Sequence, residues 1–284
     1  MIIVKMSRIN AVAPCMRLST ASAPPLKLYG FDVSQPTRSI LLLCEEAGVD
    51  YTYKTLNILV GEHKQEAYMK INPNGTMPTI QDELAEDNVF TLFEGAAMLK
   101  YGTFASSHRA MPPFRYPQAY FADLNLYLST HMSIVAITRG LRDFYPEEDF
   151  VARARIDQWM HWHHHATRMG TFAHLRPALL GVPPTENSEE KFIDAMQVLE
   201  KALASSPTGF VAQTPTISVA DLLLLPELDQ IGPDVTNLFD FSAYPHVQQY
   251  VSKMQAALPK SYATNVANLK GGIAQLKPDA LVQS

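Results

Sequence analysis

A serine that stands just before a helix is the first candidate for chemistry in this chain. Ser34 precedes Pro36, a residue that the first turn of a helix tolerates because its missing N–H needs no partner there. A hydroxyl at the positive end of a helix can stabilise an anion such as a thiolate. Serine is also a common helix N-cap, which is a purely structural role. The residue alone leaves both interpretations open.

Histidines form a second candidate cluster, made of His161, His163, His164 and His165. The first and last are four residues apart, a spacing that puts both on one face of a helix. A zinc site takes three or four protein ligands, and two histidines at this spacing do not complete one. We therefore predict no metal at this cluster.

The elements that must position Ser34 follow from hydrophobic periodicity. Strand-favouring residues occupy 26–31, and a helix is predicted beyond Pro36 because Ile40, Leu43, Cys44 and Ala47 form one apolar stripe, which Gly48 ends. Further strands are predicted at 51–56, 76–81 and 89–93, and helices at 62–70 and 94–101. This order, β-α-β-α-β-β-α, predicts an α/β domain over residues 26–102.

An all-α part is predicted over residues 146–284. Helices are expected at 186–203, 218–230 and 244–258, whereas the tail beyond them is weakly patterned. Ser218 and Asp221 predict a capping box, and Ile217 can touch Leu222 as a hydrophobic staple. Because 222–225 is apolar on every side, this helix should lie at the centre of its bundle.

Composition limits the class of function. The 284 residues, 47% of them hydrophobic, suit two domains, and a net charge of −5 with scattered basic residues argues against nucleic acid as a partner. No apolar run reaches the roughly 20 residues of a membrane span. Cys15 and Cys44 provide neither a disulfide framework nor a cysteine metal site. We expect a cytoplasmic protein with no membrane partner.

The first 25 residues leave the compartment open. They contain Lys5, Arg8 and Arg17 and no acidic residue, a pattern that permits a transit peptide. A disordered extension or an overcalled start codon is the alternative. If residues 1–25 do target the chain, the location is organellar instead of cytoplasmic.

Six segments in order resemble the glutathione S-transferase family, closest to its theta class. The first four are SQPTRS, GEHK, INPNGTMPTI and LFEGAAMLKY, which resemble the N-terminal thioredoxin-like domain of these enzymes. The other two, ARARIDQWMHWHH and PTISVADLLLLPELDQ, resemble helices of their all-α C-terminal domain. The resemblance implies a thioredoxin-like α/β domain followed by an all-α helical bundle domain.

The resemblance also implies roles for residues that would bind glutathione. Ser34 would donate its hydroxyl to the glutathione thiolate, as in serine-type enzymes, and is the predicted catalytic residue. Met77, before Pro78 at a cis-proline corner, would offer its backbone N–H and C=O to the cysteinyl part. His63 would contact the glycine carboxylate.

Other roles implied by the resemblance concern the γ-glutamyl group and the electrophile. Glu94 and Gly95 would recognise the γ-glutamyl group, and we expect Gly95→Ser to tighten binding because relatives carry serine there. Arg155 and Trp162 are candidates for the electrophile pocket, and a core or interface role is the alternative. For Arg38, one turn into the helix after Ser34, a solvated surface arginine is preferred over a residue that supports the site.

As a whole, the resemblance implies a homodimeric, serine-type, theta-like transferase active in detoxification. It would conjugate glutathione, its co-substrate, to a small hydrophobic electrophile. The alternatives are a glutathione-dependent dehalogenase or isomerase, and a catalytically silent interaction module.

The resemblance fails over residues 103–145, which are longer than the family's short linker. A lid-like insertion and a gene-model error explain this stretch equally well. We predict that removing residues 103–144 leaves a soluble protein that still binds glutathione.

Overall fold

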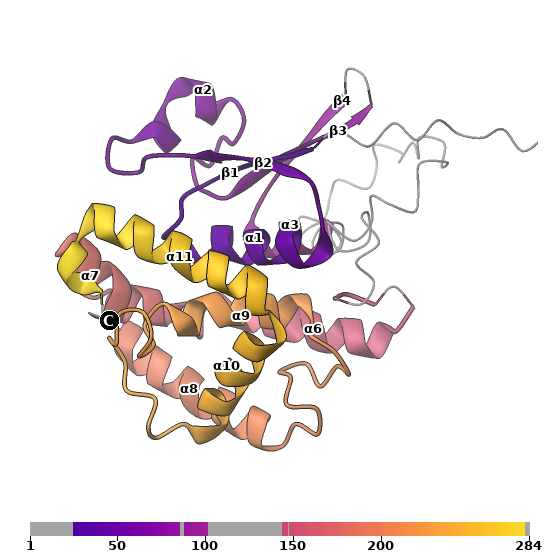
Figure 1. The fold of residues 1–284 in the computed structure, drawn as a ribbon, viewed down its shortest axis with the longest axis vertical. Coiled ribbons are helices and arrows are strands. Elements are labelled where there is room, and N and C mark those ends of the chain that lie inside the picture. The colour runs from indigo at the N-terminus through magenta and orange to yellow at the C-terminus, as the bar shows by residue number, and fades with distance from the viewer. Residues whose placement is uncertain (1–24, 86–87, 102–143, 147, 282–284) are drawn as a thin grey trace, which may run out of the picture.

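The computed structural model describes residues 25–85, 88–101, 144–146 and 148–281. Within them a four-stranded sheet with its helices lies above a helical part (Figure 1). Residues 1–24 and 102–143 lie outside the described residues. The N-terminal extension and most of the insertion therefore stay predictions. Among the described residues, no helix is both long enough and apolar enough to cross a membrane.

The N-terminal domain is a mixed sheet of strand order β2-β1-β3-β4. Strand β1 (Leu26–Gly30) pairs parallel with β2 (Tyr51–Thr55) and antiparallel with β3 (Thr79–Ala85), which pairs antiparallel with β4 (Asn88–Phe93). Helices α1 (Gln35–Ala47) and α3 (Gly95–Tyr101) lie on the face toward the helical part, and α2 (Glu66–Met69) lies beyond the other face (Figure 1). The thioredoxin-like prediction is confirmed.

Helix α1 begins and ends where the sequence indicates. Ser34 occupies the N-cap position, and Gly48 takes the left-handed conformation at the other end, with φ of 61°. The backbone N–H of Val49 donates to the carbonyl of Cys44 at 2.9 Å, which satisfies one of the last free carbonyls of the helix. The apolar stripe of this helix is buried against the sheet and the helical part.

The helical part is built around one fully buried helix, α9 (Val219–Asp229). Helices α6 (Phe150–His163) and α10 (Pro245–Ala257) pack against it, and α8 (Ser188–Ala204) packs on α10. Helix α11 (Pro259–Leu276) packs on α1 and α10, beside the short α7 (Arg176–Leu180) and the 3₁₀ helix η4 (Pro278–Ala280). A π-helical turn, η3 (Thr171–Leu175), leads into α7. The predicted capping box is present, since the backbone N–H of Ser218 donates to Asp221 Oδ2 at 2.8 Å.

Three expectations for the elements were wrong. The helix expected at 62–70 is a 3₁₀ turn, η1 (Glu62–Lys64), followed by the single turn of α2. The strand expected from residue 76 begins only at Thr79, because the peptide bond that precedes Pro78 is cis and the chain turns there. The tail beyond residue 258 was expected to be weakly patterned, yet it forms α11.

Helix α11 was missed because its signals are tertiary. Pro259, which often ends a helix, here opens one, and Gly272 weakens the helical pattern. A β-carbon at Gly272 would lie 2.8 Å from Val33 Cγ2, so the glycine permits α11 to approach the turn that leads to Ser34. The close approach accounts for the small residue.

The expected insertion ends earlier than the sequence indicated. The carbonyl of Phe144 accepts the backbone N–H of Val219 at 2.9 Å, at the start of α9. The side chain of Tyr145 is fully buried, and its hydroxyl lies 3.0 Å from Asp157 Oδ1. Both residues therefore belong to the helical part, and a deletion of the insertion has to stop at residue 143.

Candidate functional site

The turn that carries Ser34 is fixed by backbone contacts. The N–H of Ser34 donates to the carbonyl of Phe31 at 2.8 Å, and its own carbonyl accepts from Arg38 at 3.0 Å. Gly30, at the end of β1, has Thr37 so near that a β-carbon there would lie 2.3 Å from the threonine methyl group. The hydroxyl of Ser34 makes no capping hydrogen bond, although the residue is the N-cap. The half-buried hydroxyl is thus available to a ligand.

A pocket of about 260 Å³ lies beside this turn, between the sheet domain and the helical part. From the sheet domain it is lined by Pro36, Asn74, Thr76, Met77, Pro78, Glu94, Gly95 and Ala96. From the helical part it is lined by His163, His164, Arg168 and Leu223. Four of the residues predicted to bind glutathione are therefore brought together in one wall.

The Met77–Pro78 corner has the backbone form that the sequence predicted. The peptide bond between them is cis. Neither the N–H nor the C=O of Met77 makes a hydrogen bond to another described residue. A free donor and acceptor on one residue at the wall of a pocket can pair with an extended ligand as a further strand would.

Glu94 and Gly95 lie at the start of α3, on the same wall. Glu94 has φ of 78°, a conformation uncommon for residues other than glycine, and its side chain is exposed. Gly95 lies against Pro36: a β-carbon there would be 2.9 Å from Pro36 Cβ. A side chain at Gly95 would press on Pro36 and require a shift there, so Gly95→Ser would do more than add a binding hydroxyl.

Two predicted residues of the sheet domain lie beside the pocket without lining it. Ser34 is two residues from Pro36, which does line it. His63 lies in η1, close to Gly75: a β-carbon built on Gly75 would be 3.1 Å from the carbonyl oxygen of His63. Gly75 follows Asn74, which lines the pocket. The Nδ1 atom of His63 is buried and has no hydrogen-bond partner among the described residues.

The two residues proposed for the electrophile side are not part of this wall. Arg155 is exposed on α6. Trp162 packs edge-on against Trp159, with ring centroids 5.0 Å apart, and contacts the core. Neither lines the pocket as the described residues form it.

The helical wall instead presents residues that the sequence interpretation missed or assigned otherwise. His163 is 1% exposed, and its Nδ1 lies 2.8 Å from Thr167 Oγ1. Burial and the nearby Arg168 hold the pKa of His163 well below its usual value, so the ring is neutral. Burial also lowers the pKa of His164. Among the described residues, no group of three or more potential ligands could hold a metal ion.

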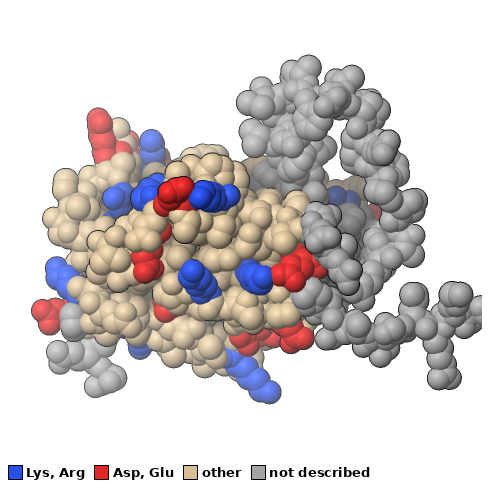
Figure 2. All heavy atoms as spheres, turned by 90° about the horizontal axis from the view of Figure 1, so that it is seen from above, with Lys and Arg blue, Asp and Glu red and all other residues tan. Residues whose placement is uncertain are grey.

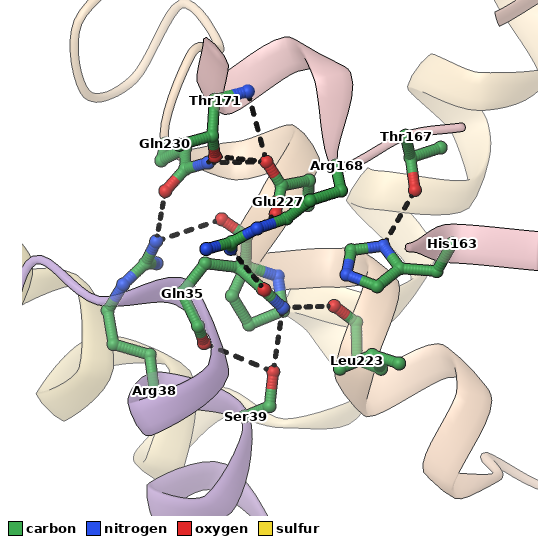
Figure 3. A network of polar contacts seen from close by, with 11 residues as sticks. Gln35, Arg38, Ser39, His163, Thr167, Arg168, Thr171, Leu223, Glu227 and Gln230 are labelled. Carbon is green, nitrogen blue, oxygen red and sulfur yellow. Dashed lines mark hydrogen bonds and ion pairs between the residues drawn. The ribbon is translucent and has the colours of Figure 1, made fainter. Parts of the chain in front are cut away.

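Arg168 is the cationic member of the pocket wall. Its Nη1 donates to Gln35 Oε1 at 2.9 Å and lies 3.3 Å from Glu227 Oε2 (Figure 3). One signal in the sequence could have found it, because it is the only arginine or lysine between Arg155 and Arg176. A lone basic residue that follows a helix entering the core is expected to pair with a buried acidic group or to bind a ligand.

A buried polar network joins this wall to α1 (Figure 3). Arg38 Nη2 donates to the carbonyl of Pro226 at 3.0 Å and to Gln230 Oε1 at 2.6 Å. The prediction of a solvated Arg38 was therefore wrong, since the side chain is 0% exposed. Burial lowers the pKa of Arg38 to about 10, against the opposing effect of Asp229 and Glu227.

On the face drawn in Figure 2, the charges of the described residues form no basic patch of the kind that binds nucleic acid. Over the part of the face in Figure 2 that described residues form, basic and acidic side chains are intermixed instead of gathered into one basic patch. A nucleic-acid site would need clustered lysines and arginines.

Comparison with known proteins identifies the relatives of this chain. Residues 34–101 match the family model for the glutathione S-transferase N-terminal domain. A curated mouse protein, glutathione S-transferase theta-1, is 27% identical over 83% of this chain and 84% of its own length. These matches confirm the family resemblance seen in the sequence.

Solved structures support the same fold. A delta-class glutathione transferase from Nilaparvata lugens aligns with a TM-score of 0.64 and 24% identity, over 89% of this chain and 99% of its own. A glutathione transferase homolog from Drosophila mojavensis with bound glutathione aligns with a TM-score of 0.62 and 21% identity, over 90% and 97% of the two chains. Because theta- and delta-class names both occur among the matches, the class stays a prediction.

Proposed function

Because the chain contains a glutathione S-transferase N-terminal domain and has glutathione S-transferase relatives over most of its length, we propose that it is a serine-type, theta-like glutathione transferase. It joins the thiolate of glutathione to a small hydrophobic electrophile. The observation that carries the proposal is the single pocket wall formed by Met77, Pro78, Glu94 and Gly95 beside the free hydroxyl of Ser34.

The backbone of Met77 is the proposed anchor for the cysteinyl part of glutathione. Its unpaired N–H and C=O give two hydrogen bonds that fix the ligand in one direction. The exposed carboxylate of Glu94 suits the ammonium of the γ-glutamyl group. His63, with a buried nitrogen that lacks a partner, is the proposed contact of the glycine end.

Ser34 is the proposed catalytic residue. It stabilises the negative charge of the glutathione thiolate and does not itself attack the electrophile. Its hydroxyl donates a hydrogen bond to the thiolate, which favours the ionised form and lowers the pKa of the thiol. The thiol proton goes to solvent, the sulfur attacks the electrophilic carbon, and the leaving group departs with its electron pair. The cationic Arg168 in the opposite wall adds to the stabilisation of the thiolate.

The electrophile is proposed to enter from the helical side, where His163, His164 and Leu223 line the pocket. The ring of His163 is neutral, so this side favours uncharged molecules more than its histidines alone would suggest. The proposal extends to a homodimeric enzyme that acts in detoxification in the cytoplasm.

The test is binding first and chemistry second. We expect retention on glutathione-agarose with release by free glutathione, and conjugation of glutathione to an activated aryl halide above the uncatalysed rate. Retention without conjugation would favour the silent interaction module. Halide release from a haloalkane with glutathione regenerated, or isomerisation of a substrate with glutathione regenerated, would favour the dehalogenase or isomerase. A chain that is not retained and not active would refute the proposal.

A further inference from the structure

A carboxylate buried in the last turn of the most apolar helix is the feature that the proposed function leaves unexplained. Glu227 lies in α9, and its side chain is 0% exposed. Burying a charge costs several kcal/mol unless hydrogen bonds satisfy it. Capping explains Asp221, in the first turn of the same helix, whereas Glu227 lies two residues before the C-terminal end of α9, where the helix dipole disfavours a negative charge.

The surroundings of Glu227 consist of donors. Its Oε1 accepts from the N–H of Thr171 at 3.2 Å, from the hydroxyl of Thr171 and from Gln230 Nε2 at 2.9 Å. Its Oε2 faces Nη1 of Arg168 at 3.3 Å. Burial raises the pKa of Glu227, whereas Arg168 and the Thr171 hydroxyl oppose the rise. The Thr171 N–H, the Gln230 side-chain amide N–H and the Arg168 guanidinium can only donate, so these three contacts favour the ionised carboxylate.

The donors come from elements that meet at the pocket (Figure 3). Thr171 opens the π-helical turn three residues after Arg168, so the widened turn brings both its N–H and its hydroxyl to Glu227. Nη1 of Arg168 is also bonded to Gln35, the residue that follows Ser34. Nε and Nη2 of Arg168 make no hydrogen bond to a described residue, and the side chain lines the pocket.

We propose that Glu227 is a positioning residue for the reaction, holding one nitrogen of Arg168 so that the rest of the guanidinium faces the thiolate. This inference rests on the proposed function. Glu227 itself does not touch the substrate. It acts through Arg168, and through the bond from Arg168 to Gln35 it also ties the helical wall to the turn that carries Ser34.

The geometry makes Glu227→Gln a selective test. The amide has one acceptor and one donor end, and three donors surround the Oε1 position. The amide oxygen therefore takes that place, and the NH₂ group is turned toward Nη1 of Arg168, where two donors oppose each other. The substitution keeps the shape of the side chain and breaks only the contact with the arginine.

We expect Glu227→Gln to lower kcat/KM about 10- to 100-fold, as misplacement of a charged group near the reacting atoms does. The pKa of enzyme-bound glutathione, followed by the ultraviolet absorbance of the thiolate, should rise because the cation is no longer held near the sulfur. In an Arg168→Met background the same substitution should change kcat/KM by less than about twofold, because Arg168, through which Glu227 acts, is no longer there.

The matched control is Asp229→Asn, which neutralises a buried acid of the same helix that bonds Tyr262 and does not line the pocket. It should leave kcat/KM and the thiol pKa unchanged. Thr171→Val, which removes one donor to the carboxylate, is the second variant if Glu227→Gln does not fold. It should shift the thiol pKa in the same direction by less.

Two failures can be told apart. A wild type that neither binds nor conjugates glutathione refutes the proposed function. An active wild type with a folded Glu227→Gln variant of unchanged thiol pKa refutes the positioning role alone. An equal loss of kcat/KM from Glu227→Gln in the wild-type and Arg168→Met backgrounds would also refute the positioning role, because Glu227 would then act only on the fold.

Discussion

The side-chain amide of Asn265, in the last long helix, donates to the backbone carbonyl of Arg38 at 2.9 Å. The C-terminal helix α11 is therefore bonded to α1, the helix that begins just after Ser34. The guanidinium of the same Arg38 reaches in the other direction to α9. One buried residue thus joins the sheet domain to two helices of the helical part.

Replacement of Arg38 tests this junction. We expect Arg38→Ala to lower the free energy of unfolding by about 3–5 kcal/mol, because it removes a buried cation that donates to the Pro226 carbonyl and to Gln230 and that lies near Asp229. Urea unfolding followed by circular dichroism measures it. The control Arg155→Ala, at an exposed site on the surface of α6, should cost less than about 0.5 kcal/mol. Equal effects of the two substitutions would mean that Arg38 does not join the domains.

The hydroxyl of Ser34 should matter for rate and not for stability. We expect Ser34→Ala to lower kcat about 10²- to 10³-fold, the cost of one donor aimed at an anion. Since the hydroxyl makes no capping bond, the free energy of unfolding should change by less than about 0.5 kcal/mol. Ser205→Ala, at the exposed end of α8, is the control for activity. A folded Ser34→Ala protein with the turnover of wild type would exclude the catalytic role.

Gly95→Ser reverses the expectation drawn from the sequence. The new β-carbon would lie 2.9 Å from Pro36 Cβ, so α1 and α3 must separate at the pocket wall. We expect a loss of about 1–3 kcal/mol in the free energy of unfolding, together with weaker glutathione binding by calorimetry. Gly271→Ser, on α11, is matched because a β-carbon there meets nothing within 4 Å, and it should be nearly neutral. Tighter glutathione binding by Gly95→Ser would restore the original expectation.

His163 should make the protein less stable in acid. Its pKa in the folded state lies well below 6.5, so as pH falls below 6.5 the unfolded chain binds a proton that the folded one does not. The free energy of unfolding then falls by about 1.4 kcal/mol per pH unit for this group. We expect His163→Gln to flatten the dependence between about pH 6.5 and 5, measured by urea titration at each pH. His165→Gln, at an exposed position, is the control, and an unchanged slope in His163→Gln would contradict the prediction.

Local patterns in the sequence determined much of the fold and the position of Ser34. The order of strands and helices in the N-terminal domain, the end of α1 at Gly48 and the capping box of Ser218 and Asp221 all follow from residues within a few positions of one another. Backbone geometry and hydrogen bonding act over this range, so periodicity and caps report them. The corner at Met77 and Pro78 was inferred from the family resemblance and is also present.

Only the tertiary structure decided which charged residues are buried and which residues form the pocket. Arg38 and Glu227 are 189 positions apart, and nothing local to either indicates that they share one network. Pro36 excludes a side chain at Gly95 across the interface of two helices, and Gly272 permits α11 to meet Val33. Such contacts depend on how distant segments pack, because burial and close approach are properties of the assembled core.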